Sequence, residues 1–212
     1  MQPTVNRLRA RYDEFIRYCD NEFENFMKKL ANINKLQNTV IILSSDHGES
    51  FEHNYRAHGG AHLYEQVTFI PFIIKGPDQT EGRVINDLTE QIDIPPTILD
   101  LANIPAPSWM EGRSLLPLMQ GKRLPLRPIF SMNFEKNPSL GHEITKGTVA
   151  VWEGDYKLIH YLENNESLLF NLKQDPDELN NLFEKEPEIG QRLLTLIQKN
   201  IKEANERIKR EK

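Results

Sequence analysis

Asn38-Thr-Val-Ile-Ile-Leu-Ser-Ser-Asp-His-Gly48 is the stretch of sequence that decides the fold. Within residues 38–45, positions 39–43 are β-branched or apolar in succession, so the strand that this run predicts has two apolar faces. Such a strand is typical of the middle of a mostly parallel sheet that is covered on both sides. The strand runs directly into Asp46 and His47, and open α/β sheets bind ligands at this kind of strand end.

The chain before this strand has the pattern of a long amphipathic helix. Apolar residues recur at spacings of three and four from Val5 to Leu30, and charged residues fill the other face. Cys19 lies on the apolar stripe, and we expect it to be a small buried hydrophobic side chain.

A second apolar run and a second helix follow the strand. Residues 69–74 form the apolar run, and residues 93–102 have helical spacing that starts with Asp93 and two prolines, both typical of a helix start. Helix, strand, loop, strand and helix make an α/β pattern. We therefore expect a partial, mostly parallel sheet flanked by helices.

The last third of the chain has a different pattern. Short strands are predicted at 148–152, 156–161 and 167–171, with turn residues between them, and an amphipathic helix is predicted over 189–208. These elements indicate a small C-terminal antiparallel sheet with a terminal helix. We place the domain boundary between residues 1–127 and residues 128–212.

Composition excludes several classes of partner. The 212 residues carry 26 Lys and Arg against 31 Asp and Glu, and the net charge of −5 gives no electrostatic case for nucleic acid or an anionic membrane. No apolar run approaches the roughly 18 residues that a membrane span needs. A single cysteine excludes an internal disulfide framework, and nothing in the sequence indicates a compartment or an oligomeric state.

Asp46 and His47 are the best candidates for chemistry. A carboxylate beside an imidazole, followed by Gly48, offers two ligands for a divalent cation on a tightly turning backbone. Imidazole suits zinc and other transition metals, whereas carboxylate oxygen also suits calcium and magnesium. The alternative is an ordinary turn in which Asp46 accepts local backbone hydrogen bonds.

Histidines are concentrated in the loop after the strand. Four of the six histidines lie within sixteen residues, namely His47, His53, His58 and His62. Any of them is either a solvated loop residue or a contact for an anionic ester. His58 is well placed because Gly59-Gly60 lets backbone approach a ligand closely. Glu49 is either a partner of this site or a first-turn carboxylate of a helix.

Several stretches, taken in order, resemble the second half of a sulfatase, a member of the alkaline-phosphatase-like superfamily of sulfate and phosphate ester hydrolases. They are NTVIILSSDHGESFEH (38–53), LYEQVTFIPFIIKGP (63–77), TEQIDIPPTILDLANI (89–104) and MEGRSLLPLMQGK (110–122). WEGDYKLIHY (152–161) and SLLFNLKQDPDELNNL (167–182) resemble the family's C-terminal subdomain. The resemblance implies that residues 1–127 are the C-terminal part of the catalytic domain and 128–212 the antiparallel-sheet subdomain.

The resemblance also implies roles for individual residues. Sulfatases hold one divalent ion, usually calcium, partly through an Asp followed by Asn or His, and these positions match Asp46 and His47; zinc or manganese are the alternatives. The family's basic residue that contacts the sulfate corresponds here to Gly60. We therefore expect His58 or His62 to bind the substrate anion and to protonate the leaving alcohol.

One family feature is missing from the sequence. Sulfatases carry a Cys- or Ser-x-Pro-x-Arg motif whose Cys or Ser becomes the formylglycine nucleophile, and no such motif occurs here. The formylglycine is therefore not encoded in this chain. The resemblance implies a missing N-terminal half, and we expect the chain alone to be inactive toward sulfate esters, whether of small molecules or of sugars.

Two other interpretations stay open. A phosphodiesterase or phosphoethanolamine transferase of the same superfamily, with zinc in place of calcium, also combines such an Asp-His-Gly turn with several histidines. A non-catalytic truncated remnant would explain the missing nucleophile directly.

Overall fold

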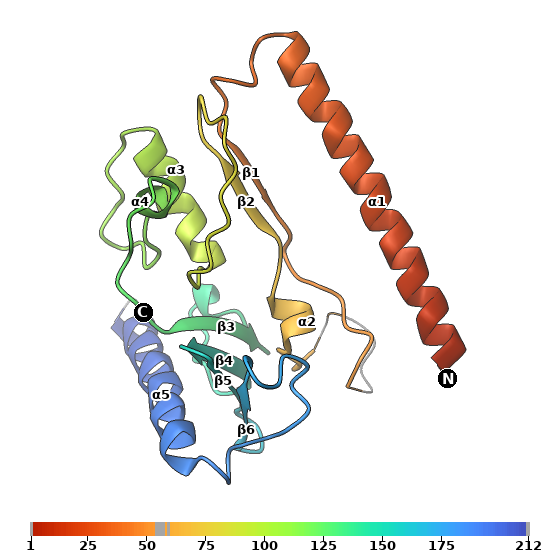
Figure 1. Cartoon of the computed structure of the whole chain (residues 1–212). Coiled ribbons are helices and arrows are strands. Elements are labelled where there is room, and N and C mark those ends of the chain that lie inside the picture. Colours follow the sequence, from red (N-terminus) through yellow and green to blue (C-terminus); the bar gives the residue numbers. More distant parts are fainter. Residues whose placement is uncertain (1, 54–57, 59, 211–212) are drawn as a thin grey trace. The chain divides into compact units, whose positions relative to one another are not determined.

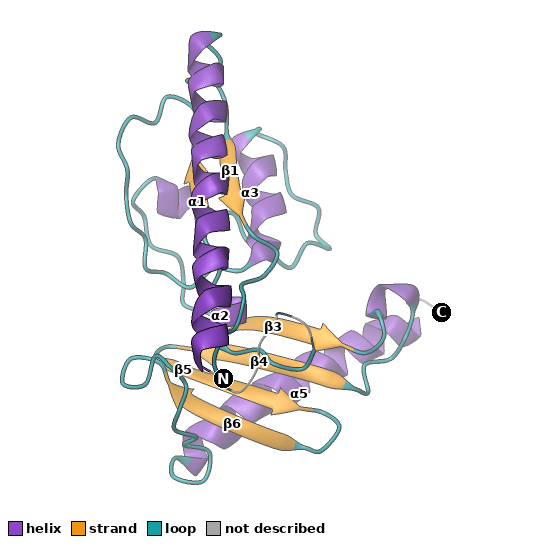
Figure 2. Ribbon diagram, turned by 90° about the vertical axis from the view of Figure 1, so that its right-hand side faces the viewer, coloured by secondary structure: helices purple, strands orange, loops and turns teal. Residues whose placement is uncertain are grey.

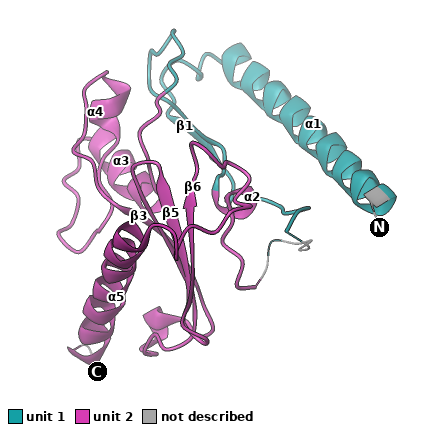
Figure 3. Cartoon of the chain, turned by 60° about the horizontal axis from the view of Figure 1, so that its bottom comes forward, with its two compact units in different colours: residues 1–58, 69–84 teal, residues 59–68, 85–212 magenta. Residues whose placement is uncertain are grey.

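The structure is a computed structural model of the chain and describes residues 2–53, 58 and 60–210. Its elements follow in the order α1 (Gln2–Asn32), β1 (Ile41–Ser44), α2 (Glu65–Thr68), β2 (Phe72–Lys75), η1 (Gln91–Asp93), α3 (Ile94–Leu101), α4 (Leu116–Met119), β3 (Ile129–Phe134), η2 (Pro138–Leu140), β4 (Gly147–Glu153), β5 (Tyr156–Tyr161), β6 (Glu166–Asn171) and α5 (Pro187–Arg210) (Figure 1). They divide into two compact units (Figure 3), residues 1–58 with 69–84 and residues 59–68 with 85–212.

The sheet of the first unit has two strands, β1 and β2, which run antiparallel. Ile41 pairs with Lys75 at one end of the sheet and Ser44 with Phe72 at the other. Every strand pair in the described residues is antiparallel, so the expected mostly parallel sheet is wrong. A continuous apolar run indicates that both faces of a strand are apolar, but it does not indicate the direction of the neighbouring strand. That direction depends on the connection between the two strands, and antiparallel strands can be joined without a crossover helix.

The long helix α1 is confirmed, but its apolar side is open to solvent. The exposed side chains along it include Leu8, Tyr12, Phe15, Ile16, Tyr18 and Phe26. Cys19 is also exposed, so the expectation that it is buried is wrong. The apolar stripe has the helical period that the sequence predicts, but within the described residues most of its side chains are not covered.

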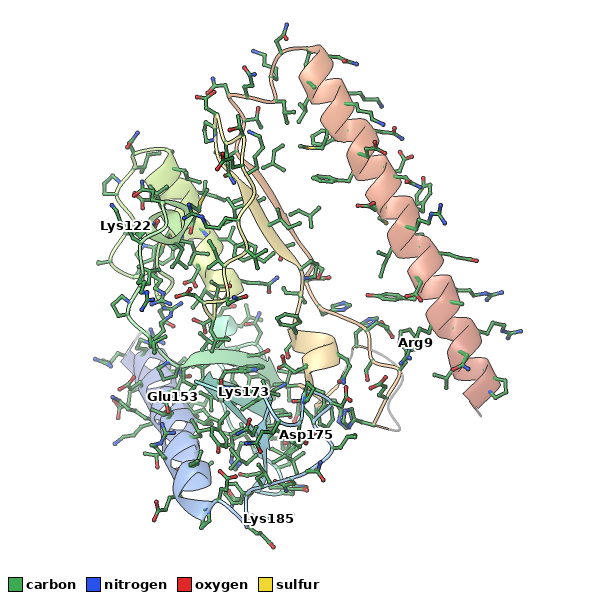
Figure 4. The ribbon with its side chains drawn as sticks, in the orientation of Figure 1. Arg9, Lys122, Glu153, Lys173, Asp175 and Lys185 are labelled. Carbon is green, nitrogen blue, oxygen red and sulfur yellow. The ribbon has the colours of Figure 1, made fainter. Side chains whose placement is uncertain are left out.

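The helix α1 contacts the loop that follows β1. The guanidinium of Arg9, which is labelled in Figure 4, lies 2.7 Å from the Glu52 carboxylate and over the ring of Phe51. The rings of Tyr12 and Phe51 meet edge to face with centroids 5.7 Å apart. These contacts attach the histidine-rich loop to α1 within the first unit.

The second unit contains a four-stranded antiparallel sheet in the order β3-β4-β5-β6. The three predicted strands are confirmed as β4, β5 and β6, and the predicted terminal helix is confirmed as α5. Figure 2 shows α5 lying across one face of this sheet. Strand β3 was not predicted, because its sequence IFSMNF lies within a segment rich in Pro and Gly that reads as connections.

Both faces of this sheet are covered, because successive side chains of a strand point to opposite sides. Val149 and Val151 of β4 pack with Leu193 and Ile197 of α5 on one side. The other side holds a cluster of Leu63, Ile129, Ala150, Trp152, Ile159 and Phe170. The segment around Leu63, which follows the histidine-rich loop, is therefore part of the core of the second unit.

Asp93, expected to cap a helix, joins several segments of the second unit. Its carboxylate accepts hydrogen bonds from the backbone N–H groups of Glu90 and Arg113 and pairs with the Arg127 guanidinium at 2.6 Å. The side chain is fully buried. It thus caps the short helix η1 from within and connects the start of α3 to the segment that leads into β3.

The units are discontinuous in sequence, and the domain boundary after residue 127 stays a prediction. Within residues 2–53, 58 and 60–210, no helix is both long and apolar enough to cross a membrane.

Candidate functional site

Strand β1 delivers Asp46 and His47 to the start of a loop in the first unit. The Asp46 side chain is 88% exposed and that of His47 40% exposed. The backbone N–H of His47 donates to Asp46 Oδ1 at 3.1 Å. This is the local hydrogen bond of an ordinary turn, and it leaves the second carboxylate oxygen of Asp46 available.

The tautomer of His47 follows from its hydrogen bond. Its Nδ1 lies 3.0 Å from the carbonyl oxygen of Gly48, and a carbonyl only accepts, so Nδ1 carries the proton. In the neutral ring Nε2 then keeps its lone pair. That nitrogen lies 3.7 Å from Asp46 Oδ2.

These two atoms fit one cation. Carboxylate oxygen binds calcium at about 2.3–2.6 Å and imidazole nitrogen binds zinc at about 2.0–2.1 Å, so one bond from each donor atom to a shared cation can span the 3.7 Å separation. Within the described residues, no group of three or more His, Cys, Asp or Glu side chains is gathered as for a metal. A metal ion held by Asp46 and His47 would therefore need further ligands beyond these two donor atoms.

His58 joins this cluster from the far side of the loop. Its ring stacks on that of His47, with centroids 4.0 Å apart and planes at 13°. Its Nδ1 lies 2.5 Å from the Glu49 carboxylate, so it donates to Glu49 and leaves Nε2 pointing elsewhere. The His58 side chain is half exposed. A histidine held by a carboxylate in this way can bind an anion or give up a proton.

Asp46, His47, Glu49 and His58 are thus brought together, all within the first unit. The hydrogen bond to His58 supports a role for Glu49 as a partner of the site residues rather than as a first-turn carboxylate of a helix. Sequence spacing did not indicate that the His58 ring would lie on His47, because the contact spans a loop of unpredictable path.

His62 belongs to the second unit. It is half buried, and its ring lies nearly parallel to that of Tyr64 with centroids 6.1 Å apart. Gly60, at the family's sulfate-contact position, has a φ of 87° and accepts a hydrogen bond from the Asn133 side chain with its carbonyl. His53 is half buried with a left-handed φ of 53°.

Sequence reasoning missed the contacts that hold the loop in place. The pairing of Arg9 with Glu52 joins residues 43 positions apart, and such pairs have no local sequence signal. Residues 54–57 and 59, including the first glycine after His58, lie outside the described residues.

Comparison with known families shows which family the chain belongs to. Residues 52–207 match the model of the family described as N-sulphoglucosamine sulphohydrolase, C-terminal. The chain belongs to this sulfatase family. A second model, described only as a protein of unknown function, matches residues 5–75.

Named sulfatases are similar to this sulfatase-family chain over most of its length. Human arylsulfatase K is 32% identical over 194 residues, which cover 87% of the chain and 35% of the relative. A solved 2-O GAG sulfatase is 28% identical with a TM-score of 0.72, covering 84% of the chain and 39% of that structure. A third protein, solved with its substrate D-glucosamine-2-N,6-O-disulfate, is 25% identical with a TM-score of 0.70, covering 88% and 39%.

The chain spans about a third of the length of the curated relatives that it matches. The match to a C-terminal family model confirms the resemblance to the second half of a sulfatase. At the family level the chain therefore belongs to the sulfuric ester hydrolases.

Proposed function

We propose that this chain is the C-terminal portion of a sulfatase-type hydrolase that cleaves sulfate esters with the help of a divalent metal ion. The observation that carries the proposal is the Asp46 and His47 pair at the end of β1 in a chain of the sulfatase family, with donor atoms 3.7 Å apart. The similarity to named sulfatases favours this over a phosphodiesterase or phosphoethanolamine transferase.

In this proposal Asp46 Oδ2 and His47 Nε2 hold the metal ion, which we expect to be calcium, with zinc or manganese as alternatives. A bound cation would polarise the ester oxygens and stabilise negative charge. The hydrogen bond from His47 Nδ1 to the Gly48 carbonyl fixes the ring, and in the neutral imidazole it leaves the Nε2 lone pair for a metal ion.

His58 or His62 contacts the substrate anion and supplies the proton to the leaving alcohol. For His58 the support is its Glu49 partner, because a carboxylate at Nδ1 orients the ring. Its side chain is half exposed, so the ring can be reached from solvent.

The substrate class is a sulfate ester of a small molecule or sugar. A similar protein is named a 2-O GAG sulfatase, and another was solved with a disulfated glucosamine. The nucleophile belongs to an N-terminal half, since no Cys- or Ser-x-Pro-x-Arg motif is present in this sequence. We therefore expect the chain alone to have no sulfatase activity.

Metal binding tests the first part of the proposal. Titration of the purified chain with calcium and with zinc is expected to show binding of calcium that weakens at least about tenfold in Asp46→Asn. Asp78→Asn, which removes an exposed carboxylate elsewhere in the first unit, is the matched control and should leave the affinity unchanged. Zinc binding without calcium binding would favour the phosphoester alternative.

Hydrolysis of an aryl sulfate tests the second part. The chain is assayed alone and together with an N-terminal sulfatase half that carries the formylglycine motif. Activity is expected only in the combination, and His58→Gln or His62→Gln, whichever removes the anion contact, should lower kcat by about 10²–10⁴-fold. If no N-terminal half restores activity, the chain is better explained as a non-catalytic remnant.

A further inference from the structure

Lys157 of β5 is fully buried and pairs with two carboxylates. Its Nζ lies 2.9 Å from Glu65 Oε1 and 2.7 Å from Glu178 Oε1. It also lies 4.6 Å from the ring centroid of Trp152, its direct cross-strand neighbour on β4. All of these residues belong to the second unit.

The two carboxylates come from segments far from β5 in the sequence. Glu65 begins α2, 92 residues before Lys157, and Glu178 lies in the loop between β6 and α5. Glu65 also accepts from Trp152 Nε1 at 2.9 Å, and its backbone N–H donates to Glu178 Oε2 at 2.6 Å. The first turn of α2 is thus attached to the sheet through both its backbone and its side chain.

The charge of Lys157 joins the two carboxylates in one buried ion-pair cluster. Burial raises the pKa of Glu178, and the Lys157 ammonium opposes that rise by stabilising the carboxylate. An ammonium buried without a partner is very costly, so the three groups hold one another in place. Glu178 also has a left-handed φ of 54°, a backbone conformation that its surroundings must maintain.

The attached segment begins with His62. Between His62 and Glu65, Leu63 is buried in the core cluster with Trp152 and Phe170, and Tyr64 lies between the His62 and Phe170 rings with centroids 6.1 and 6.2 Å away. On the other side of His62, the Gly60 carbonyl accepts from Asn133 of β3.

We propose that Lys157 is a positioning residue for His62, which it holds against the sheet through Glu65 and Glu178. The inference rests on the proposed function, in which His62 is one of the two candidates for contact with the sulfate group. A catalytic side chain must be held within about 0.5 Å of its productive place, and a buried ion pair three residues away supplies such a constraint.

Nuclear magnetic resonance of the full 212-residue chain tests the inference. Lys157→Met removes the charge while keeping much of the side-chain volume. The His62 ring signals are expected to shift and broaden, and the amides of Glu65, Val67 and Thr68 should exchange at least about tenfold faster. Lys157→Arg, which keeps the charge, should restore part of the protection.

The matched control is Lys173→Met. Lys173, labelled in Figure 4, is 77% exposed, pairs with Asp155 at 3.7 Å and belongs to the same unit as Lys157. Lys173→Met should leave the His62 signals and the exchange rates of the Glu65, Val67 and Thr68 amides unchanged. The buried His160 ring and the amides of Val149 and Val151 serve as internal references, and they should change less than about twofold in Lys157→Met.

The inference is overturned if folded Lys157→Met keeps the His62 signals and the exchange rates of wild type. It is also overturned if Val149 and Val151 accelerate as much as Glu65, because the ion pair would then stabilise the sheet as a whole. Should Lys157→Met fail to fold, Glu65→Gln takes its place, since it keeps an acceptor for Trp152 and removes the charge. Unchanged His62 signals in that variant overturn the inference equally.

These measurements need neither metal nor sulfate ester. A chain that failed the sulfatase assays would still show whether Lys157 holds His62. Failure of the inference, in turn, would leave the metal and activity tests unaffected.

Discussion

His160 of β5 is a histidine that the structure assigns to the core. It is 4% exposed, and its Nδ1 lies 2.9 Å from the Ser167 hydroxyl on β6. Burial lowers the pKa of His160, with a smaller opposing effect from the hydrogen bond at the Glu166 backbone. Its burial in the sheet and its hydrogen bond to Ser167 account for the presence of His160 in the core, and they give it no role in the candidate site.

The lowered pKa of His160 makes stability depend on pH in a definite direction. Unfolded, the ring titrates near pH 6.5, whereas the folded protein keeps it neutral to lower pH. Below about pH 6.5 the unfolded state therefore binds a proton that the folded state does not bind, and this favours unfolding. The contribution of His160 to the free energy of unfolding is complete above about pH 6.5 and is lost as the pH falls toward the folded pKa.

His160→Gln should reduce the loss of stability on acidification. Urea unfolding at about pH 7.5 and at about pH 5.5 should show a smaller difference in His160→Gln than in wild type, with an overall cost of about 1–3 kcal/mol. The exposed His142→Gln is the control and should keep the wild-type difference. An unchanged pH dependence in His160→Gln would contradict the assignment.

At the scale of elements, α5 owes its place to one apolar stripe. Leu193 and Ile197 are fully buried against Val149, Val151, Leu158 and Leu169 of the sheet. Gly190, on the same helix, lies so close to the Phe183 ring that an added Cβ would meet it at 2.8 Å. Close packing of this kind means that a deleted side chain leaves a cavity.

Leu193→Ala should therefore be strongly destabilising. We expect a loss of about 2–5 kcal/mol in the free energy of unfolding, measured by urea denaturation. Leu179→Ala, at a side chain that is 70% exposed, should cost less than about 0.5 kcal/mol. Similar losses in the two variants would mean that α5 does not pack as the structure has it.

The sequence predicted the C-terminal elements better than the others, for a local reason. The turn at Glu153-Gly154-Asp155 is marked by Gly154, which has a φ of 61°, and the strands on either side pair with their neighbours in sequence. Strand β3 has no such turn, since it pairs with β4 across a longer connection that includes η2. The direction of β1 relative to β2 depends likewise on a long connection.

At the scale of the whole molecule, the two units differ in how well their sheets are covered. In the first unit Ile73 of β2 is 59% exposed, and no residue of β1 or β2 is fully buried. In the second unit six of the seven β4 residues are buried. Apolar burial is the main stabilising force, so the two sheets should differ in local stability.

Amide hydrogen exchange of the native chain measures this difference. Amides of β1 and β2 should exchange at least about 100-fold faster than those of β4 and β5. Equal protection in both sheets would contradict the separation into a well-covered and a poorly covered unit.

The sequence by itself determined the helices α1 and α5, the strands of the C-terminal meander, the sulfatase family and the adjacency of Asp46 and His47. These depend on periodicity, turn residues and neighbours along the chain, which are local. Tertiary structure alone decided the antiparallel pairing of β1 with β2, the stacking of His58 on His47 with Glu49 beside it, and the burial of Lys157 between Glu65 and Glu178. Those contacts join residues separated by loops, and a residue pattern does not specify the path by which a loop brings its ends together.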